Sequence, residues 1–356
     1  MSLARELAVW QQAESLARRI ALADAPAELP ELAGEVRQLG VQLLEQAMAA
    51  DRLARLLALL NEQLCCRAIE LTARRMPLPA ASWCWLNFGS AGRLEQTLIS
   101  DQDNGLVFSA LDAGEADALR PLFLLFADAV NQLLAECGFS LCRGGIMAGN
   151  PACCLSLEEW QWQFSEWVRR PDPEALLKAS IFFDLRPVHG DLALGRKLLE
   201  GLRHLVADYP VFLYQMARNA LDIDVPLNFL GEVVCESREG GGKAVDLKKS
   251  GTRLFVDAVR ILALAAGSSS VATRERLQQA AACSGLEPRD AAAMIEAFRQ
   301  LLRLRFHAQA LGLASGSGEE VPLDPEEMHD MERVLLKEAL KQARRLQQRL
   351  KLNYSL

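Results

Sequence analysis

One continuous stretch, Trp83–Phe108, constrains the fold more than any other part of the chain. It opens with an apolar, aromatic run at Trp83–Phe88, which is typical of a buried strand. A second apolar run, Gly105–Ser109, predicts another strand. The residues between them begin with a Gly-Ser pair and leave room for a short helix. The stretch therefore predicts strand, turn, helix and strand, with polar residues held between two buried segments.

The turn after the first predicted strand has the composition of a phosphate contact. Gly89 lets the backbone bend sharply and approach a ligand. Ser90 is expected to cap a helix from about Ala91 to Thr97, and the free N–H groups of a helix N-terminus suit a phosphate. Arg93 lies in the first turn and can add a charge-assisted hydrogen bond. We therefore expect Gly89, Ser90 and Arg93 to contact phosphate groups.

Two aspartates, Asp101 and Asp103, lead into the second predicted strand. Residues i and i+2 of a strand project from one face, so the two carboxylates are expected to point the same way. At about 4 Å and an effective dielectric constant of about 20, their repulsion costs roughly 4 kcal/mol. A bound cation would remove it, and oxygen ligands favour Mg²⁺, or Mn²⁺ in its place. Taken alone, such a pair is also typical of a solvated turn.

The order of these motifs resembles the signature of the DNA polymerase beta-type nucleotidyltransferases: Gly89-Ser90, ten intervening residues, then Asp101-x-Asp103. The longer string GSAGRLEQTLISDQDNGLVF resembles a bacterial nucleotidyltransferase family related to the PII-protein uridylyltransferase and the glutamine-synthetase adenylyltransferase. Many members carry cyclic-nucleotide-binding and CBS domains upstream, and the segment before the first strand is too short for such a module. Further matching strings are CRGGIMAGNPACCLSLEEW, FFDLRPVHGD and VDLKKSG.

The resemblance implies an α+β fold, in which a small mixed sheet is flanked by helical regions on both sides. The expected division is a helical region at 1–78, a nucleotidyltransferase core at 79–200 and a helical domain at 201–356. Apolar residues at three- and four-residue spacing predict helices through most of the first and last regions. Within the core, a helix is expected at Ala116–Cys137, a capped helix at Ser156–Trp167 and a third buried strand at Ser180–Leu185.

Asp184 lies within that third apolar run, where an unpaired carboxylate is expensive to bury. A salt bridge to Arg186 or a solvated strand end would satisfy it. The resemblance implies instead that Asp184 is the third carboxylate of a metal cluster with Asp101 and Asp103, and that it helps hold a second metal ion near the attacking oxygen. Arg186 would then pair with Asp184 or contact phosphate.

The string at 245–251 places two lysines beside an aspartate. One interpretation is a solvated start of a helix. The other is that Lys248 or Lys249 reaches the phosphates of the nucleotide.

The resemblance implies transfer of a nucleoside monophosphate from an NTP, such as ATP, to a hydroxyl or phosphate acceptor with release of pyrophosphate. The named relatives modify proteins, so the leading acceptor is a side chain of a regulatory protein in signal transduction. Two alternatives stay open. The chain could be a nucleotide-binding regulator without turnover, or a scaffold protein whose sheet is a relic.

Charge and cysteine content limit the other classes of function. The net charge of −7 argues against a non-specific nucleic-acid binder, which needs a basic surface. No stretch reaches the length expected of a membrane-spanning helix, and no membrane partner is expected. The nine cysteines are odd in number and show no Cys-x-x-Cys spacing, which favours reduced thiols in a cytoplasmic protein. The oligomeric state cannot be read from the sequence.

Overall fold

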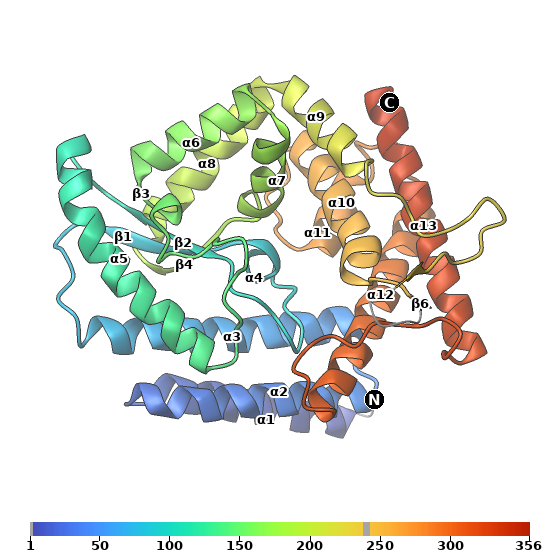
Figure 1. Ribbon diagram of the computed structural model, residues 1–356, viewed down its shortest axis with the longest axis horizontal. Helices are drawn as coiled ribbons and strands as arrows, with labels where there is room; N and C mark the ends of the chain where they lie inside the picture. Colours follow the sequence, from blue (N-terminus) through green and yellow to red (C-terminus); the bar gives the residue numbers. More distant parts are fainter. Residues whose placement is uncertain (1–2, 238–242) are drawn as a thin grey trace. The chain divides into compact units, whose positions relative to one another are not determined.

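The computed structural model describes residues 3–237 and 243–356 (Figure 1). Its contacts divide the chain into two compact units. The first consists of Met1–Met48, Arg52–Arg170 and Leu177–Leu205, and the second of Ala49–Asp51, Pro171–Leu176 and Val206–Leu356.

Three helices open the first unit, as their apolar spacing predicts. They are α1 (Leu3–Leu22), α2 (Leu29–Glu45) and α3 (Ala50–Ala73), with a short 3₁₀ turn at Pro26–Glu28 before α2. Figure 1 shows α1 and α2 side by side, with α3 between them and the sheet. Leu53, Leu57 and Leu64 of α3 are almost completely buried, so this helix forms part of the core on one face of the sheet.

The sheet has four strands in the order β3-β2-β1-β4. The strands are β1 (Trp83–Asn87), β2 (Asn104–Phe108), β3 (Cys154–Ser156) and β4 (Arg186–Gly190). β1 is antiparallel to both β2 and β4, whereas β2 and β3 are parallel. The structure thus confirms the predicted α+β fold with a small mixed sheet, and both strands expected within Trp83–Phe108.

Helix α5 (Ala113–Glu136) covers the sheet and matches the predicted helix at Ala116–Cys137. The Phe123 ring stacks on Phe108 at 5.0 Å, and the Phe126 ring meets Trp83 edge-on at 5.4 Å. By length and composition alone, α5 is the one helix among the described residues that could cross a membrane, which corrects the expectation that no stretch reaches that length. A core helix passes the same test, and these ring contacts show α5 packing on the sheet.

The third predicted strand is wrong. The first half of the run at Ser180–Leu185 ends a helix, α7 (Pro173–Phe182), the second half is a turn, and the two additional strands of the sheet are β3 and β4. A short apolar run fits a buried helix as well as a buried strand, and the alanines and leucines that precede it favour the helix. The capped helix is confirmed: in α6 (Leu157–Arg169), Ser156 and Glu159 form a reciprocal capping box. Helix α8 (Leu192–Asp208) follows.

The second unit is mainly helical. Its larger elements are α9 (Pro210–Ala220), α10 (Arg253–Ala265), α11 (Thr273–Ala280), α12 (Pro288–Ala314) and α13 (Asp330–Tyr354). α12 packs along α13, and α10 along α11. A hairpin of β5 (Glu236–Ser237) and β6 (Lys243–Ala244) precedes a π-helical turn, Lys248–Thr252. The three consecutive glycines at residues 240–242 also predict a flexible turn, and they lie outside the described residues.

Candidate functional site

The register of β1 and β2 places the two motifs of the sequence at one edge of the sheet. Asn87 at the end of β1 lies opposite Asn104 at the start of β2. Just beyond this pair, the Phe88 N–H donates to the Asp103 carbonyl at 2.9 Å. The residues after β1 and those before β2 therefore meet, and they enclose a pocket with about 340 Å³ of empty space, part of it open to solvent.

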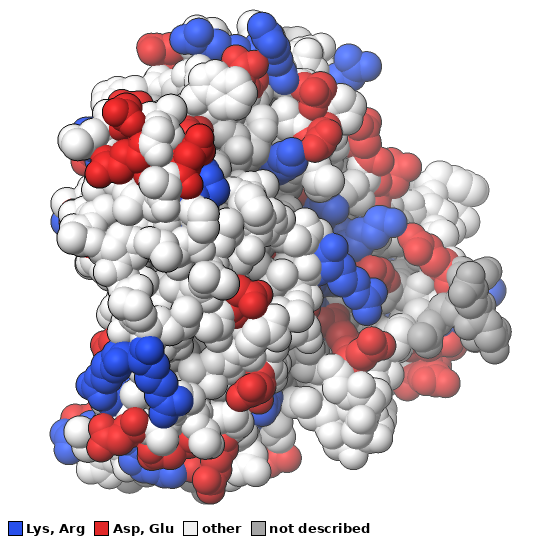
Figure 2. Space-filling view, turned by 60° about the vertical axis from the view of Figure 1, so that its left-hand side comes forward, with Lys and Arg blue, Asp and Glu red and all other residues white. Residues whose placement is uncertain are grey.

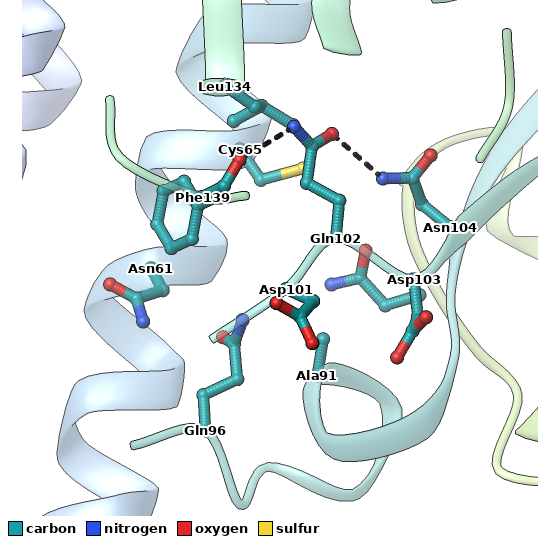
Figure 3. A pocket seen from close by; sticks show the side chains of 11 residues that line it. Asn61, Cys65, Ala91, Gln96, Asp101, Gln102, Asp103, Asn104, Leu134 and Phe139 are labelled. Carbon is teal, nitrogen blue, oxygen red and sulfur yellow. Dashed lines mark hydrogen bonds between the residues drawn. The ribbon is translucent and has the colours of Figure 1, made fainter. Parts of the chain in front are cut away.

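Asp101 and Asp103 both line this pocket. Figure 3 shows their carboxylates on the side facing Ala91, in helix α4 (Gly89–Arg93), and the Gln102 side chain turned the opposite way. Extended backbone accounts for the alternation, since Asp101 bridges Ser140 and the Gln102 N–H donates to the Ser140 carbonyl at 2.9 Å. The predicted geometry of two carboxylates on one face is therefore present.

Helix α4 (Gly89–Arg93) begins directly after β1 and is shorter than expected. Gly89 has a φ of +53°, and a Cβ there would lie 2.6 Å from Asp103 Oδ2, so glycine allows the backbone to approach the carboxylate closely. The predicted helix at Ala91–Thr97 is wrong, because Leu94 is left-handed at φ 60° and ends the helix. The predicted cap is also wrong: Phe88 is the N-cap residue, and no side chain caps the helix.

Arg186, at the start of β4, is engaged with protein groups around α4. Its side chain forms an ion pair with Glu62 of α3 and donates to the carbonyls of Gly92 and Ala91 at 3.2 and 3.3 Å. These carbonyls belong to the last turn of a helix, where a cation is favoured. Arg186 thus holds α4 in place, and its predicted phosphate contact stays a prediction.

Asp184 lies in the interior between α7 and β4, with no exposed surface. Its Oδ2 accepts from Nη1 of Arg93 at 2.5 Å, and Nε of Arg93 donates to Glu95 at 2.8 Å. Among residues 3–237 and 243–356, no group of three or more His, Cys, Asp or Glu side chains is arranged to hold a metal ion. The role of Asp184 as a third metal ligand therefore stays a prediction.

Lys248 belongs to the second unit, where it is exposed at the start of the π-helical turn. It lines a separate pocket there with Glu236, Asp246 and Glu320. Its predicted contact with the nucleotide phosphates stays a prediction.

A network of buried carboxamides, which sequence reasoning missed, fixes the segment that carries the two aspartates. Nδ2 of Asn131 donates to Gln102 Oε1 at 2.8 Å and to Asn104 Oδ1 at 3.0 Å. The same oxygen of Asn104 accepts a hydrogen bond from the Ala148 N–H at 2.8 Å. Asn131 Oδ1 accepts one from the Gly149 N–H at 2.9 Å. The signal was available in the sequence, since Asn131 is a polar residue on the apolar face of a helix.

The pocket suits a cation held by oxygen atoms. Mg²⁺ usually binds through one or two carboxylates together with substrate phosphates, and Asp101 and Asp103 supply the two carboxylates. Thiols are disfavoured as ligands, because only the thiolate binds a metal. Burial raises the pKa of the Cys65 thiol, which lines the pocket, well above its usual value. Burial also raises the pKa of Cys142, where the charge of Asp103 acts in the same direction. All nine cysteines are free thiols, as expected from their spacing.

Two family models match the chain. One, described as Putative nucleotidyltransferase DUF294, covers residues 34–174, and the other, described as Putative nucleotidyltransferase substrate binding domain, covers residues 210–354. The first match includes Gly89, Asp101 and Asp103, the second includes Lys248, and Asp184 falls between them. No curated protein matches the chain.

Proposed function

We propose that the chain transfers a nucleoside monophosphate from an NTP to an acceptor. The premise is that the chain belongs to the Putative nucleotidyltransferase DUF294 family and carries both of its domains. The observation that carries the proposal is the shared orientation of Asp101 and Asp103 into one pocket, beside the backbone of Gly89. In this proposal the two carboxylates bind the Mg²⁺ or Mn²⁺ ion that accompanies the triphosphate.

The residues of the chain act mainly by positioning. Gly89 leaves space for the terminal phosphates next to Asp103, and the Ser90 hydroxyl contacts them. The carboxamides of Gln102, Asn104 and Asn131 hold the aspartate segment rigidly, so that little reorganisation is needed when substrate binds. The metal ion, when bound, neutralises negative charge on the triphosphate. The acceptor oxygen bonds to the α-phosphorus, pyrophosphate leaves, and the proton of the acceptor hydroxyl passes to water.

The acceptor we propose is a hydroxyl side chain of a regulatory protein in the cytoplasm, consistent with the free thiols. Nucleic acid is not included among the acceptors, because the net charge is −7. On the face seen in Figure 2, groups of basic side chains alternate with acidic ones.

A second candidate function is nucleotide binding without turnover. The ion pair between Arg93 and Asp184 favours it, because Asp184 would have to leave Arg93 before it could bind a metal ion. This candidate and the transferase share the same nucleotide site and differ only in turnover.

The test combines binding and turnover. We would measure thermal stabilisation by each of the four NTPs, with Mg²⁺ or Mn²⁺, and pyrophosphate release in the presence of cell lysate. The variants are Asp101→Asn and Asp103→Asn, with Asp128→Asn on the exposed side of α5 as the matched control.

The expected result is a metal-dependent shift and pyrophosphate release, both retained by Asp128→Asn. The two site variants should lose the shift and at least roughly 100-fold of the turnover, since metal ions supply several kcal/mol of charge stabilisation. A shift without pyrophosphate release supports the second candidate. If no nucleotide produces a shift, both nucleotide functions are refuted, and the scaffold interpretation remains.

A further inference from the structure

Three of the carboxamides that line the pocket come from three different elements. Asn61 belongs to α3, Asn87 ends β1, and Gln96 follows α4. They share the pocket with Asp101 and Asp103. None of the three carries a functional role in the sequence interpretation, and Asn61 comes from the N-terminal helices.

Among the residues that the structure describes, these three side chains are buried but have no partner for their polar atoms. Their exposed fractions are 9% for Asn61, 7% for Asn87 and 6% for Gln96. Within residues 3–237 and 243–356 no side-chain hydrogen bond is formed by any of the three, and each of their polar side-chain atoms keeps some exposure to solvent. Buried carboxamides are usually hydrogen-bonded, because an unsatisfied polar group costs free energy.

The neighbouring carboxamides show the contrast. Gln102, Asn104 and Asn131 lie at the same pocket or directly behind it, and they bond to each other and to the backbone. Their role is therefore structural. Asn61, Asn87 and Gln96 instead keep their donors and acceptors available to a molecule in the pocket.

Two of the three carboxamides lie away from the turn at Gly89, whereas Asn87 precedes that turn by two residues. Gly89 approaches Asp103, whereas Figure 3 shows Gln96 and Asn61 on the side of Asp101 away from Asp103. A carboxamide carries both a donor and an acceptor but no charge. That side of the pocket therefore suits a neutral group with several hydrogen-bonding atoms better than it suits a phosphate.

We propose that Asn61 and Gln96 form a nucleoside subsite, which binds the base edge and ribose hydroxyls of the NTP. The inference rests on the proposed nucleotide site and adds the part of the substrate that the carboxamides recognise. Asn and Gln side chains can pair with a base edge through two hydrogen bonds, which makes these residues determinants of base preference.

The experiment compares two ligands that share phosphates but not the nucleoside. Dissociation constants would be measured by calorimetry for the preferred NTP and for inorganic tripolyphosphate, both with Mg²⁺. The variants are Asn61→Leu and Gln96→Met, which keep nearly the same side-chain size. Gln63→Met, at an exposed position of α3, is the matched control, and thermal unfolding verifies that each variant folds.

Each subsite variant should weaken NTP binding about threefold to tenfold, the effect of one neutral hydrogen bond. Tripolyphosphate binding should stay unchanged, and Gln63→Met should alter neither constant. Equal weakening of both ligands, or unchanged NTP binding, would overturn the subsite. Unchanged NTP binding would indicate that the carboxamides bind the acceptor instead. A wild-type protein that binds neither ligand refutes the nucleotide site itself, whereas one that binds tripolyphosphate as tightly as every NTP refutes only the subsite.

Discussion

Nη1 of Arg93 donates to Oδ2 of Asp184 at 2.5 Å, and the Asp184 side chain has no exposed surface. The same guanidinium binds Glu95 through Nε at 2.8 Å. The Arg93 guanidinium thus pairs with two carboxylates, which come from opposite ends of the core sequence. The pair accounts for the burial of Asp184 without a metal ion, and it connects α4 to the segment that precedes β4.

Removing the cation of this pair should destabilise the fold strongly. Arg93→Met leaves the Asp184 carboxylate buried without this partner, and we expect a loss of about 3–5 kcal/mol in the free energy of unfolding. Asp184→Asn should cost less, because Arg93 keeps Glu95. Urea denaturation at neutral pH measures both. As a control, Arg18→Met breaks an exposed pair with Glu14 and should cost at most about 1 kcal/mol. Equal losses in Arg93→Met and Arg18→Met would contradict this account.

Ser90→Ala should separate function from stability. A serine that caps a helix typically contributes about 1 kcal/mol, but Ser90 forms no capping bond in α4. We therefore expect the urea midpoint to stay unchanged, while NTP affinity falls if the hydroxyl contacts phosphate. Ser156→Ala is the matched variant, because Ser156 does cap α6 and should lose about 1 kcal/mol. A destabilised Ser90→Ala protein would speak for a cap at that position.

Gly92 and Gly34 should respond in opposite ways to the same substitution. A Cβ at Gly92 would lie 1.8 Å from the Asp184 carbonyl oxygen, so Gly92→Ala must displace backbone. We expect a loss of at least about 3 kcal/mol, or no folded protein. Gly34 lies within α2, and apart from its chain neighbours and the nearby backbone of α2 no described atom comes within 4 Å of the position that a Cβ would take there. Gly34→Ala should therefore raise stability by up to about 1 kcal/mol. Thermal unfolding of the two variants tests this prediction. Similar melting temperatures would refute the close packing of α4.

Glu159 should make stability depend on pH. Burial acts to raise the pKa of Glu159, but hydrogen bonds from Arg120 and Ser156 outweigh it and lower that pKa below 4.5. A lowered pKa in the folded state means that the stabilisation is present above the unfolded pKa and is lost as the pH falls through the folded one. The stability difference between wild type and Glu159→Gln should therefore be largest at neutral pH and shrink below about pH 4.

Urea titrations at several pH values test this prediction. Glu158→Gln, at the exposed neighbouring position, is the control and should change stability by less than about 0.5 kcal/mol throughout. A difference between wild type and Glu159→Gln that is the same at pH 7 and at pH 3 would show that the charge of Glu159 contributes nothing.

The sequence alone determined the strands β1 and β2, helix α5 and the capping box of α6. Each of these depends on local signals: a run of aromatic residues, a sustained helical period, or a serine three residues before a glutamate. The same reasoning gave the orientation of Asp101 and Asp103, because alternation along extended backbone is a local property.

Tertiary structure alone decided which groups surround the carboxylates of the core and the pocket. The partner of Asp184 is Arg93, far away in the sequence, and no local pattern distinguishes it from Arg186. The end of α4 at Leu94 and the burial of Asn61 beside the pocket also depend on packing between distant segments. The local sequence determines whether a segment forms a helix or a strand. Long-range contacts decide which polar groups are paired and which are left to bind a ligand.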